Sequence, residues 1–255
     1  MVQQGLILAA GRGTRLQGHT ADRPKCMVEV CGQSILDWAI DSLHANHITQ
    51  ITAVGGYCAE KLPQDRLRVI TNPRWAETNM VATLRCASDI LYADPTVLSY
   101  GDILYHPDIV AALLNTPGDI VLTYDHWWRL LWESRFENPL EDAESFREAE
   151  GHLLEIGARV SSLDDIQGQF MGLLKLSPAG WAQIDAFLSA LPPGEVDKLD
   201  TTSLLSRLLA QGTRIATVGI EGRWCEIDGP SDLELAEQRC SAPAVWTHDW
   251  RKPTW

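Results

Sequence analysis

Basic residues are scarce in this sequence of 255 residues. Lys and Arg together number 21 against 34 Asp and Glu, so the formal net charge at neutral pH is −13. A protein that binds nucleic acid nonspecifically, or that lies on an anionic membrane, needs an excess of basic side chains to pair with phosphates. The charge balance therefore argues against both classes, and we expect neither nucleic acid nor a membrane as a partner.

Long hydrophobic runs are also missing. The first apolar run covers only residues 6–10, which is too short for a membrane span or for the hydrophobic region of a signal peptide. The residues that precede it carry no basic charge. The sequence shows no internal repeat and no low-complexity linker, and we expect a cytoplasmic globular protein.

Closely spaced cysteine pairs are absent as well, since no two of the six cysteines form a CxxC motif. Disulfide frameworks are usual in small secreted chains, and nothing in this sequence indicates secretion. We therefore expect six reduced thiols, most of them packed as small apolar side chains. They are Cys26, Cys31, Cys58, Cys86, Cys225 and Cys240.

Short apolar segments alternate with amphipathic ones over the first two thirds of the chain. This alternation predicts an α/β domain whose sheet is largely parallel, with ligands beyond the carboxyl ends of its strands. Ser34 and Asp37 have the spacing of a helix-capping pair. Strands are expected at residues 6–8, 51–54, 67–70, 96–100 and 119–123, and helices at 34–43, 79–91 and 107–114. The loops after Leu8, Val54 and Tyr100 should therefore hold the chemistry.

The alternation weakens after Tyr124. Further strands are expected at residues 153–160, 170–176, 214–218 and 223–227, and helices at 178–191, 202–210 and 230–240. We predict a single domain over residues 1–240, with an acceptor-side insertion at about 125–176, and a tail over 241–255. The tail contains Trp246, Trp250 and Trp255, which would pack on a partner subunit or on their own domain. The sequence leaves the oligomeric state open, a homo-oligomer included.

A glycine-rich loop is the strongest local signal. Residues 8–16 read Leu-Ala-Ala-Gly-Arg-Gly-Thr-Arg-Leu, and Arg-Pro-Lys follows at 23–25. Small residues let the backbone approach a ligand, and successive N–H groups can cradle phosphate oxygens. Arg15 and Lys25 would bracket a triphosphate. The dinucleotide fingerprint is excluded because Leu16 stands where it needs a glycine, and the Gly-Lys-Ser/Thr ending of a Walker A loop is absent.

The same segment resembles the signature of the nucleotidyltransferases that activate sugar phosphates and related phosphate esters. Residues 170–174 (Phe-Met-Gly-Leu-Leu) and 224–228 (Trp-Cys-Glu-Ile-Asp) are similar to the cytidylyltransferase branch that acts on phosphocholine, aminophosphonates and similar acceptors. The resemblance extends to about Gln238. It implies a Rossmann-like, largely parallel mixed sheet flanked by helices, of the nucleotide-diphospho-sugar transferase type, with a small acceptor-side elaboration. It also implies Mg²⁺ as cofactor, with Lys25 and Arg15 as catalytic residues.

Two aspartates follow strands at positions suited to hold that ion. Asp102 comes directly after the strand at 96–100, and Asp228 ends the strand at 223–227. Carboxylates at two strand tips can converge on one cation. Each aspartate alone would suit a turn or a helix cap equally well. Glu226 alternates with Asp228 along the strand and is a candidate third ligand.

The nucleobase contacts are predicted from a Gly-Tyr stretch and from a helix start. Gly56 and Tyr57 follow the second strand, as in the resembling family, while Asn79 and Thr83 match its Asn…Ser/Thr pattern. Asn79 would also serve as a helix N-cap. The expected nucleotide-binding residues are Leu8, Ala9, Ala10, Gly11, Gly13, Thr14, Arg15, Lys25, Gly56, Tyr57, Asn79 and Thr83.

The acceptor site is predicted in the segment where aromatic and acidic residues occur together. Trp127, Trp128, Trp132 and Phe136 precede or overlap a stretch, 133–150, with seven acids and two bases. Aromatic faces beside carboxylates suit an ammonium group. An arginine would suit an acceptor carboxylate or second phosphate. The candidates are Trp128, Trp132, Arg135 and Asp200; the alternative is that the aromatics form a small core of their own.

Three functions are compatible with these features. The first is a Mg²⁺-dependent cytidylyltransferase that moves CMP from CTP to a small phosphorylated or phosphonate acceptor and releases pyrophosphate. The second is a UTP- or dTTP-dependent sugar-1-phosphate nucleotidyltransferase, which would share the glycine-rich motif. The third is a non-catalytic nucleotide-binding regulatory domain. The presence of Arg15, Lys25, Asp102 and Asp228 together favours an enzyme.

Overall fold

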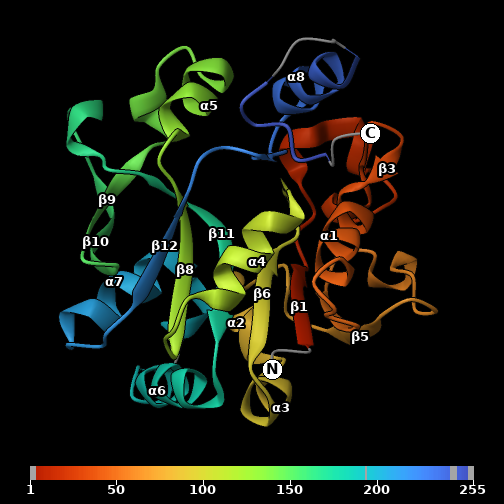
Figure 1. The fold of residues 1–255 in the computed structure, drawn as a ribbon. Helices are drawn as coiled ribbons and strands as arrows, with labels where there is room; N and C mark the ends of the chain where they lie inside the picture. Colours follow the sequence, from red (N-terminus) through yellow and green to blue (C-terminus); the bar gives the residue numbers. More distant parts are fainter. Residues whose placement is uncertain (1–3, 193, 242–245, 252–255) are drawn as a thin grey trace.

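A nine-stranded mixed sheet forms the centre of the protein (Figure 1). The computed structural model describes residues 4–192, 194–241 and 246–251. The strand order is β5-β4-β1-β6-β11-β8-β12-β10-β9, and two short pairs, β13-β7 and β2-β3, lie outside it. The strands are β1 (Gln4–Ala9), β2 (Glu29–Val30), β3 (Gln33–Ser34), β4 (Gln50–Gly55), β5 (Arg68–Thr71), β6 (Thr96–Tyr100), β7 (Ile103–Tyr105), β8 (Ile120–Asp125), β9 (Glu144–Ala149), β10 (His152–Arg159), β11 (Gln169–Leu176), β12 (Ala216–Ile220) and β13 (Trp224–Glu226).

The parallel half of the sheet brings the predicted site loops to one edge. β1 pairs in parallel with both β4 and β6, with Leu8 opposite Val54 and Tyr100. Their carboxyl ends therefore lie side by side. β11 runs antiparallel between β6 and β8, and β12 is parallel to β8. The predicted α/β, largely parallel mixed fold is confirmed.

Helices cover both faces of this sheet. The helix α4 contacts α1, β8, β11 and β12 on the face nearest the viewer in Figure 1, while α2 contacts β1 and α7, and α6 contacts β11 and α3. Ser34 caps α1 by accepting the Asp37 N–H at 3.0 Å, as its sequence spacing predicts. The helices are α1 (Ile35–His44), α2 (Met80–Arg85), α3 (Ser88–Ala93), α4 (Pro107–Asn115), α5 (Trp128–Arg135), α6 (Pro178–Ser189), α7 (Thr201–Ala210) and α8 (Pro230–Ser241). Six 3₁₀ turns add to them: Thr14–Thr20, Lys25–Met27, Ala59–Lys61, Pro139–Glu141, Leu163–Asp165 and Val196–Lys198.

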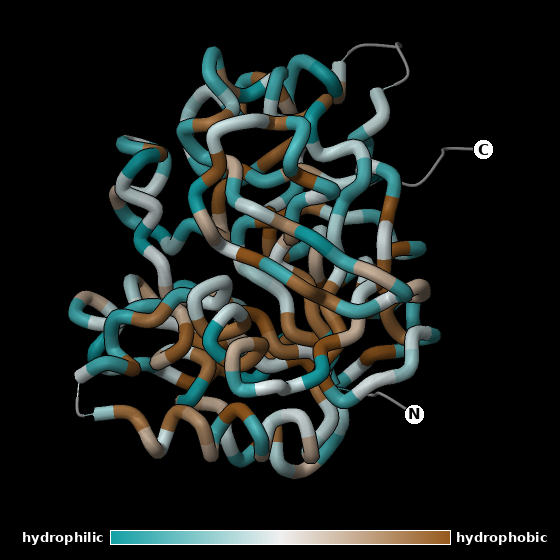
Figure 2. Tube along the Cα trace, turned by 90° about the vertical axis from the view of Figure 1, so that its left-hand side faces the viewer, coloured by the Kyte–Doolittle hydropathy of each residue, from teal (hydrophilic) through white to brown (hydrophobic). Residues whose placement is uncertain are grey.

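The apolar core fills the space between the sheet and the helices. In Figure 2 the hydrophobic stretches run through the interior, while outer turns are mostly hydrophilic. Tryptophan contributes strongly to the core, since Trp181, Trp224 and Trp250 are all fully buried. Trp250 packs edge-on against Trp38 and Trp246 of its own chain. Two of the three tail tryptophans thus pack on their own domain, and Trp255 lies outside the described residues. Among the described helices, none is both long enough and apolar enough to cross a membrane.

One predicted helix is divided in two. The expected helix at 79–91 breaks where Cys86 and Ala87 close tighter, 3₁₀-type bonds onto Thr83 and Leu84, so that α2 ends and α3 begins. Its apolar stripe is nevertheless buried on one side, as the periodicity predicts. The stripe consists of Val81, Leu84, Ala87 and Leu91.

The segment at 125–176 contributes to the central sheet itself. It supplies β9, β10 and β11, and β11 lies between β6 and β8. It also supplies α5, which packs against α8. Neither α5 nor β9 was expected from the sequence, because aromatic and acidic residues obscure the periodicity there.

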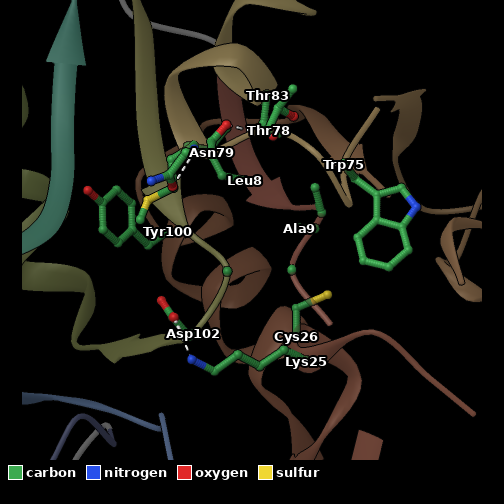
Figure 3. Close-up of a pocket in the computed structure, with 14 residues that line it drawn as sticks. Leu8, Ala9, Lys25, Cys26, Trp75, Thr78, Asn79, Thr83, Tyr100 and Asp102 are labelled. Carbon is green, nitrogen blue, oxygen red and sulfur yellow. Dashed lines mark hydrogen bonds and ion pairs between the residues drawn. The ribbon is translucent and has the colours of Figure 1, made fainter. Parts of the chain in front are cut away.

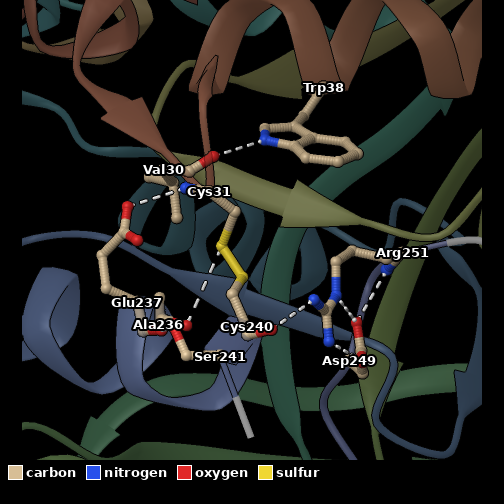
Figure 4. Close-up of a disulfide and its surroundings, with 9 residues drawn as sticks. All are labelled: Val30, Cys31, Trp38, Ala236, Glu237, Cys240, Ser241, Asp249 and Arg251. Carbon is tan, nitrogen blue, oxygen red and sulfur yellow. Dashed lines mark hydrogen bonds and ion pairs between the residues drawn. A yellow bond between two sulfur atoms is a disulfide. The ribbon is translucent and has the colours of Figure 1, made fainter.

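A disulfide contradicts the expectation of six reduced thiols. Cys31, at the β2–β3 turn, is bonded to Cys240 near the end of α8, with their Cα atoms 6.1 Å apart (Figure 4). The Cys31 N–H also donates to Glu237 of the same helix at 2.7 Å. The pair is 209 positions apart, so no local spacing could indicate it. The other four cysteines are free: Cys26, Cys58, Cys86 and Cys225.

Candidate active site

The glycine-rich loop leaves the carboxyl end of β1 and folds against Lys25. Gly13 has a left-handed backbone, with φ of +69°, and a Cβ there would lie 2.9 Å from the Cβ of Lys25. Glycine is therefore required at this position to let the lysine stem pass. The Lys25 N–H also donates to the Gly11 carbonyl at 3.3 Å. The loop thus fixes the direction in which the Lys25 side chain leaves the backbone.

Three carboxylates meet beside this lysine. Asp102, Glu226 and Asp228 each offer an oxygen, and these oxygens all lie within 4.8 Å of one another. The β13–β7 pairing sets Glu226 opposite Ile103, and the Ile227 N–H donates to the Asp102 carbonyl at 2.9 Å. Two segments more than 120 positions apart are thereby joined. The structure brings together the three residues that the sequence nominates as metal ligands.

The donor set suits a hard divalent cation. Mg²⁺ is bound through carboxylate oxygens, usually one or two of them together with phosphate and water. Asp102 Oδ1 is buried and has no hydrogen-bond partner among the described residues. An unpaired buried carboxylate oxygen is costly unless a cation or donor reaches it. Asp102, Asp228 and Glu226 would therefore suit a divalent cation.

Lys25 and Arg15 neutralise this cluster in the protein as it stands. Lys25 Nζ lies 2.7 Å from Asp102 Oδ2 and 2.7 Å from Asp228 Oδ1, and Arg15 pairs with the other Asp228 oxygen (Figure 3 shows the Lys25–Asp102 pair). Burial opposes the charge on Lys25, but Asp102 and Asp228 outweigh it and hold the pKa of Lys25 above its usual range. Arg15 is largely exposed, so it can reach toward a ligand outside the cluster.

Glu226 differs from its neighbours in its proton affinity. Burial raises the pKa of Glu226 to about 7, although Arg135 acts in the opposite direction, and Asp102 adds to the rise. Its Oε2 accepts a hydrogen bond from Arg135 Nη1 at 3.0 Å. Glu226 is therefore a carboxylate whose charge depends on cations close to it.

A pocket opens between the loop, the ends of β1 and β6, and the start of α2 (Figure 3). Figure 3 places Trp75 at one side of this pocket and Lys25 with Asp102 at its lower end. Seven predicted nucleotide-binding residues line it: Leu8, Ala9, Ala10, Gly11, Lys25, Asn79 and Thr83. Gly13, Thr14 and Arg15 do not line it, and belong to the loop that continues past Gly11.

Gly56 and Tyr57 contact two residues of the pocket wall, Trp75 and Ala10. A Cβ at Gly56 would lie 2.5 Å from the Trp75 Cβ and 2.8 Å from the Ala10 carbonyl oxygen. The Tyr57 N–H donates to that same carbonyl at 3.2 Å, and its ring packs edge-on against Trp75. These two residues position the walls of the pocket and do not line it.

Asn79 and Thr83 are both engaged with the protein. Asn79 Oδ1 caps α2 by accepting the Met80 N–H at 2.7 Å. Thr83 is buried, and its hydroxyl accepts from Asn72 Nδ2 at 3.1 Å. Their side-chain acceptors are thus partly used in holding the pocket together.

Sequence reasoning missed several lining residues. Trp75 and Thr78 follow β5, a strand whose carboxyl end was not among the loops singled out, although it lies at the same edge of the sheet. The loop after β5 begins with Asn-Pro-Arg-Trp at residues 72–75, and this sequence carries turn signals. Met80 and Tyr100 also line the pocket, and neither residue type is distinctive in the sequence.

All four predicted acceptor residues have partners within the protein. Trp128 and Trp132 are 3% and 4% exposed, and Trp132 Nε1 donates to Asp142 at 3.0 Å. Arg135 is fully engaged with Glu226 and Asp232. Asp200 Oδ1 caps α7 by accepting the Ser203 N–H at 2.7 Å. Trp128 and Trp132 lie in the main apolar core, and not in a separate small core of this segment, while Trp127 is exposed.

A buried aspartate that sequence reasoning overlooked anchors the strand that carries Glu226. Asp125 is fully buried and accepts hydrogen bonds from the Gly222 N–H at 2.8 Å and the Trp224 Nε1 at 2.9 Å. His248 Nε2 lies 2.9 Å from the same carboxylate. The Thr247 carbonyl also accepts the Arg223 N–H at 2.8 Å, so the tail is joined to the residues just before β13, while β7 pairs with β13 itself.

The fold and this site define a nucleotidyltransferase. The family model for the MobA-like NTP transferase domain matches residues 5–161, so the chain belongs to that family. The chain is 36% identical over 246 residues to CTP:phosphoglutamine cytidylyltransferase of Campylobacter jejuni, with 90% of this chain and 97% of the relative covered. The resemblance to the cytidylyltransferase branch is thereby confirmed.

Solved structures show the same fold. The inositol-1-phosphate CTP transferase of T. maritima superposes with a TM-score of 0.72 at 18% identity, covering 96% of this chain and 98% of the other. The CTP:phosphocholine cytidylyltransferase of Streptococcus pneumoniae superposes with a TM-score of 0.70 at 18% identity, covering 92% and 98%. At such identities the likeness carries the fold and not the substrate.

Proposed function

We propose that the protein is a Mg²⁺-dependent cytidylyltransferase that transfers CMP from CTP to a small phosphorylated acceptor. The observation that carries the proposal is the meeting of Lys25 with Asp102 and Asp228 at the end of the pocket beside the glycine-rich loop. The 36% identical relative, which matches over nearly its whole length, supports CTP as the nucleotide.

The reaction is a displacement at the α-phosphorus of the nucleotide. An acceptor phosphate oxygen forms the new bond to phosphorus, the bond to the bridging oxygen of the β-phosphate breaks, and pyrophosphate leaves with that electron pair. Negative charge builds on the phosphate oxygens, so the protein must place cations and N–H donors around them. A bound divalent cation supplies charge neutralisation at those oxygens.

The chain's own residues have separable parts in this reaction. Backbone N–H groups of the loop at 10–14 would bind the β- and γ-phosphates. Arg15, which is largely exposed, would reach the leaving pyrophosphate, and Lys25 would stabilise the α-phosphate. Trp75, Tyr100 and Met80 would enclose the base and exclude water from it.

For the acceptor, a phosphorylated amino acid derivative is the first candidate. It follows the relative from Campylobacter jejuni, whose name gives phosphoglutamine. Phosphocholine and aminoethylphosphonate remain candidate acceptors. The residues first nominated for the acceptor, Trp128, Trp132 and Arg135, are buried and offer it no free surface.

A pyrophosphate-release assay tests the proposal. CTP, UTP, dTTP, ATP and GTP would each be incubated with Mg²⁺ and with phosphoglutamine, phosphocholine, aminoethylphosphonate, glucose 1-phosphate or no acceptor. We expect release that needs CTP, Mg²⁺ and a phosphorylated acceptor, and that is lost in Lys25→Ala. Preference for UTP or dTTP with the sugar phosphate would replace this proposal with the sugar-nucleotide alternative.

A further inference from the structure

We propose that Arg135 and Asp232 form a positioning pair that holds the metal-binding carboxylates in place. The catalytic meaning of the pair rests on the proposed function, but its effect on cation binding does not. Neither residue lies in the pocket, so neither is placed to touch the nucleotide. Their influence must pass through Glu226 and Asp228.

Arg135 is held rigidly at the end of α5. Its side chain is 2% exposed, and its guanidinium lies 5.4 Å from the centre of the Trp132 ring and 4.9 Å from that of Phe136. Its Nη1 donates to Glu226 Oε2 at 3.0 Å, and its Nε donates to Asp232 Oδ1 at 2.9 Å. A planar guanidinium packed in this way has little freedom, so it fixes both carboxylates at once.

Asp232 transmits the same restraint to Asp228. Its Oδ2 accepts the backbone N–H of Asp228 at 2.9 Å and that of Gly229 at 2.8 Å. These bonds fix the backbone from which the Asp228 side chain leaves, at the turn between β13 and α8. Asp232 is itself 7% exposed and its pKa is lowered, because Arg135 and the two N–H donors outweigh its burial.

Two of the three candidate ligands thus depend on one arginine. Glu226 contacts Arg135 directly, and Asp228 is linked to it through Asp232. Partners behind the ligands of a metal site commonly orient them, and their loss typically costs about 10–100-fold in metal affinity. An ion pair that only joined α5 to α8 would instead change stability and leave cation affinity alone.

The test compares conservative variants of two arginines on α5 and of Asp232 on α8. Arg135→Lys keeps the positive charge, so the buried carboxylates stay compensated, but it removes the fork that reaches both of them. Arg129→Lys is the matched control, because Arg129 lies on the same helix, is half-exposed and pairs with Glu133 and Asp164 at the surface. Asp232→Asn provides a second, independent break in the link to Asp228.

Mn²⁺ binding to the nucleotide-free protein is the readout, measured by the EPR signal of unbound Mn²⁺. We expect the dissociation constant to rise about tenfold or more in Arg135→Lys and in Asp232→Asn, and to stay unchanged in Arg129→Lys. Thermal melts confirm that each variant is folded. In turnover assays the KM for Mn²⁺ should rise while the KM for CTP does not.

Three outcomes would overturn the positioning role. The first is that folded Arg135→Lys and Asp232→Asn bind Mn²⁺ with affinities within about twofold of the parent protein. The second is that Arg129→Lys loses as much Mn²⁺ affinity as these two variants. The third is that the parent protein binds no Mn²⁺. Because the binding measurement contains neither CTP nor acceptor, it decides the inference even if the pyrophosphate assay finds no substrate. Conversely, CTP turnover with unchanged Mn²⁺ affinity in the variants would refute the inference and leave the proposed function standing.

Discussion

Lys25 and Asp102, 77 positions apart in the sequence, are joined by an ion pair with Nζ and Oδ2 2.7 Å apart. The same ammonium lies equally close to Asp228. It therefore stands among the carboxylates that are the candidate ligands for a divalent cation. We therefore expect a divalent cation at this site to compete with the lysine for the same oxygens.

Lys25→Met should tighten Mn²⁺ binding to the nucleotide-free protein by about tenfold, the effect of removing an ion pair worth roughly 1.4 kcal/mol. The same change should abolish pyrophosphate release, since the α-phosphate loses its cationic partner. Equilibrium Mn²⁺ titration and the release assay measure the two effects separately. Lys61→Met, at an exposed lysine, serves as the control, and an unchanged or weaker Mn²⁺ affinity in Lys25→Met would disprove the competition.

The stability of the metal-free protein should depend on pH through Glu226. Burial raises the pKa of this group to about 7 from an unfolded value of 4.5, so the folded state holds the proton more tightly. The stabilisation that it contributes is complete below pH 4.5 and is lost as the pH rises through about 7. Urea unfolding in EDTA from pH 5 to pH 8 measures the effect.

Glu226→Gln is the comparison for that experiment. Glutamine does not titrate, so the decline in unfolding free energy between pH 5 and pH 8 should be smaller in the variant than in the parent protein. Identical pH dependence in the two proteins would show that another group is responsible.

Reduction of the Cys31–Cys240 bond should lower the free energy of unfolding by about 2–4 kcal/mol. The bond closes a long loop of the unfolded chain, and cross-links of this kind stabilise chiefly by restricting that state. Urea unfolding with and without reductant measures the change, with Cys86→Ser as a control that should respond as the parent does. In the unreduced, denatured protein four of the six cysteines should react with a thiol reagent, and six reactive thiols would contradict the bond.

Gly56→Ala should weaken CTP binding by about tenfold, since a shift of the pocket wall of even a fraction of an ångström is costly. The added methyl group would meet the Trp75 Cβ at 2.5 Å and the Ala10 carbonyl at 2.8 Å, so one of them must move. Calorimetric titration with CTP provides the measurement. Gly18→Ala is the control because a methyl group there meets nothing within 4 Å, and equal affinities in the two variants would show that Gly56 does not shape the pocket.

The fold was largely predictable because its signals are local. Buried strands such as β1 and capped helices such as α1 carry their own apolar pattern and end signals. The strand β9 escaped prediction because its core contacts come from few residues, among them the buried Phe146 within an acidic stretch. The disulfide escaped because only the folded chain brings residues 31 and 240 together.

The candidate site was predictable where chemistry lies in a motif or at a strand tip. Lys25, Asp102 and Asp228 stand at such positions, and the structure brings them within hydrogen-bonding distance. Arg135 could not be placed from the sequence, because an arginine among aromatic residues suits a ligand pocket and a buried ion pair equally well. Trp75 could be predicted as a site residue only by knowing that β5 ends at the same edge of the sheet as β1 and β4.

The contact between Asp125 and His248 also has a consequence for synthesis on the ribosome. Asp125 is buried without solvent, and His248 is translated more than a hundred residues after it. At a synthesis rate of about 5–20 residues per second, the nascent chain carries an incompletely paired Asp125 for roughly 6–25 seconds. We therefore expect the strand that bears Glu226 to reach its final place late, once His248 is available to complete the pairing of Asp125.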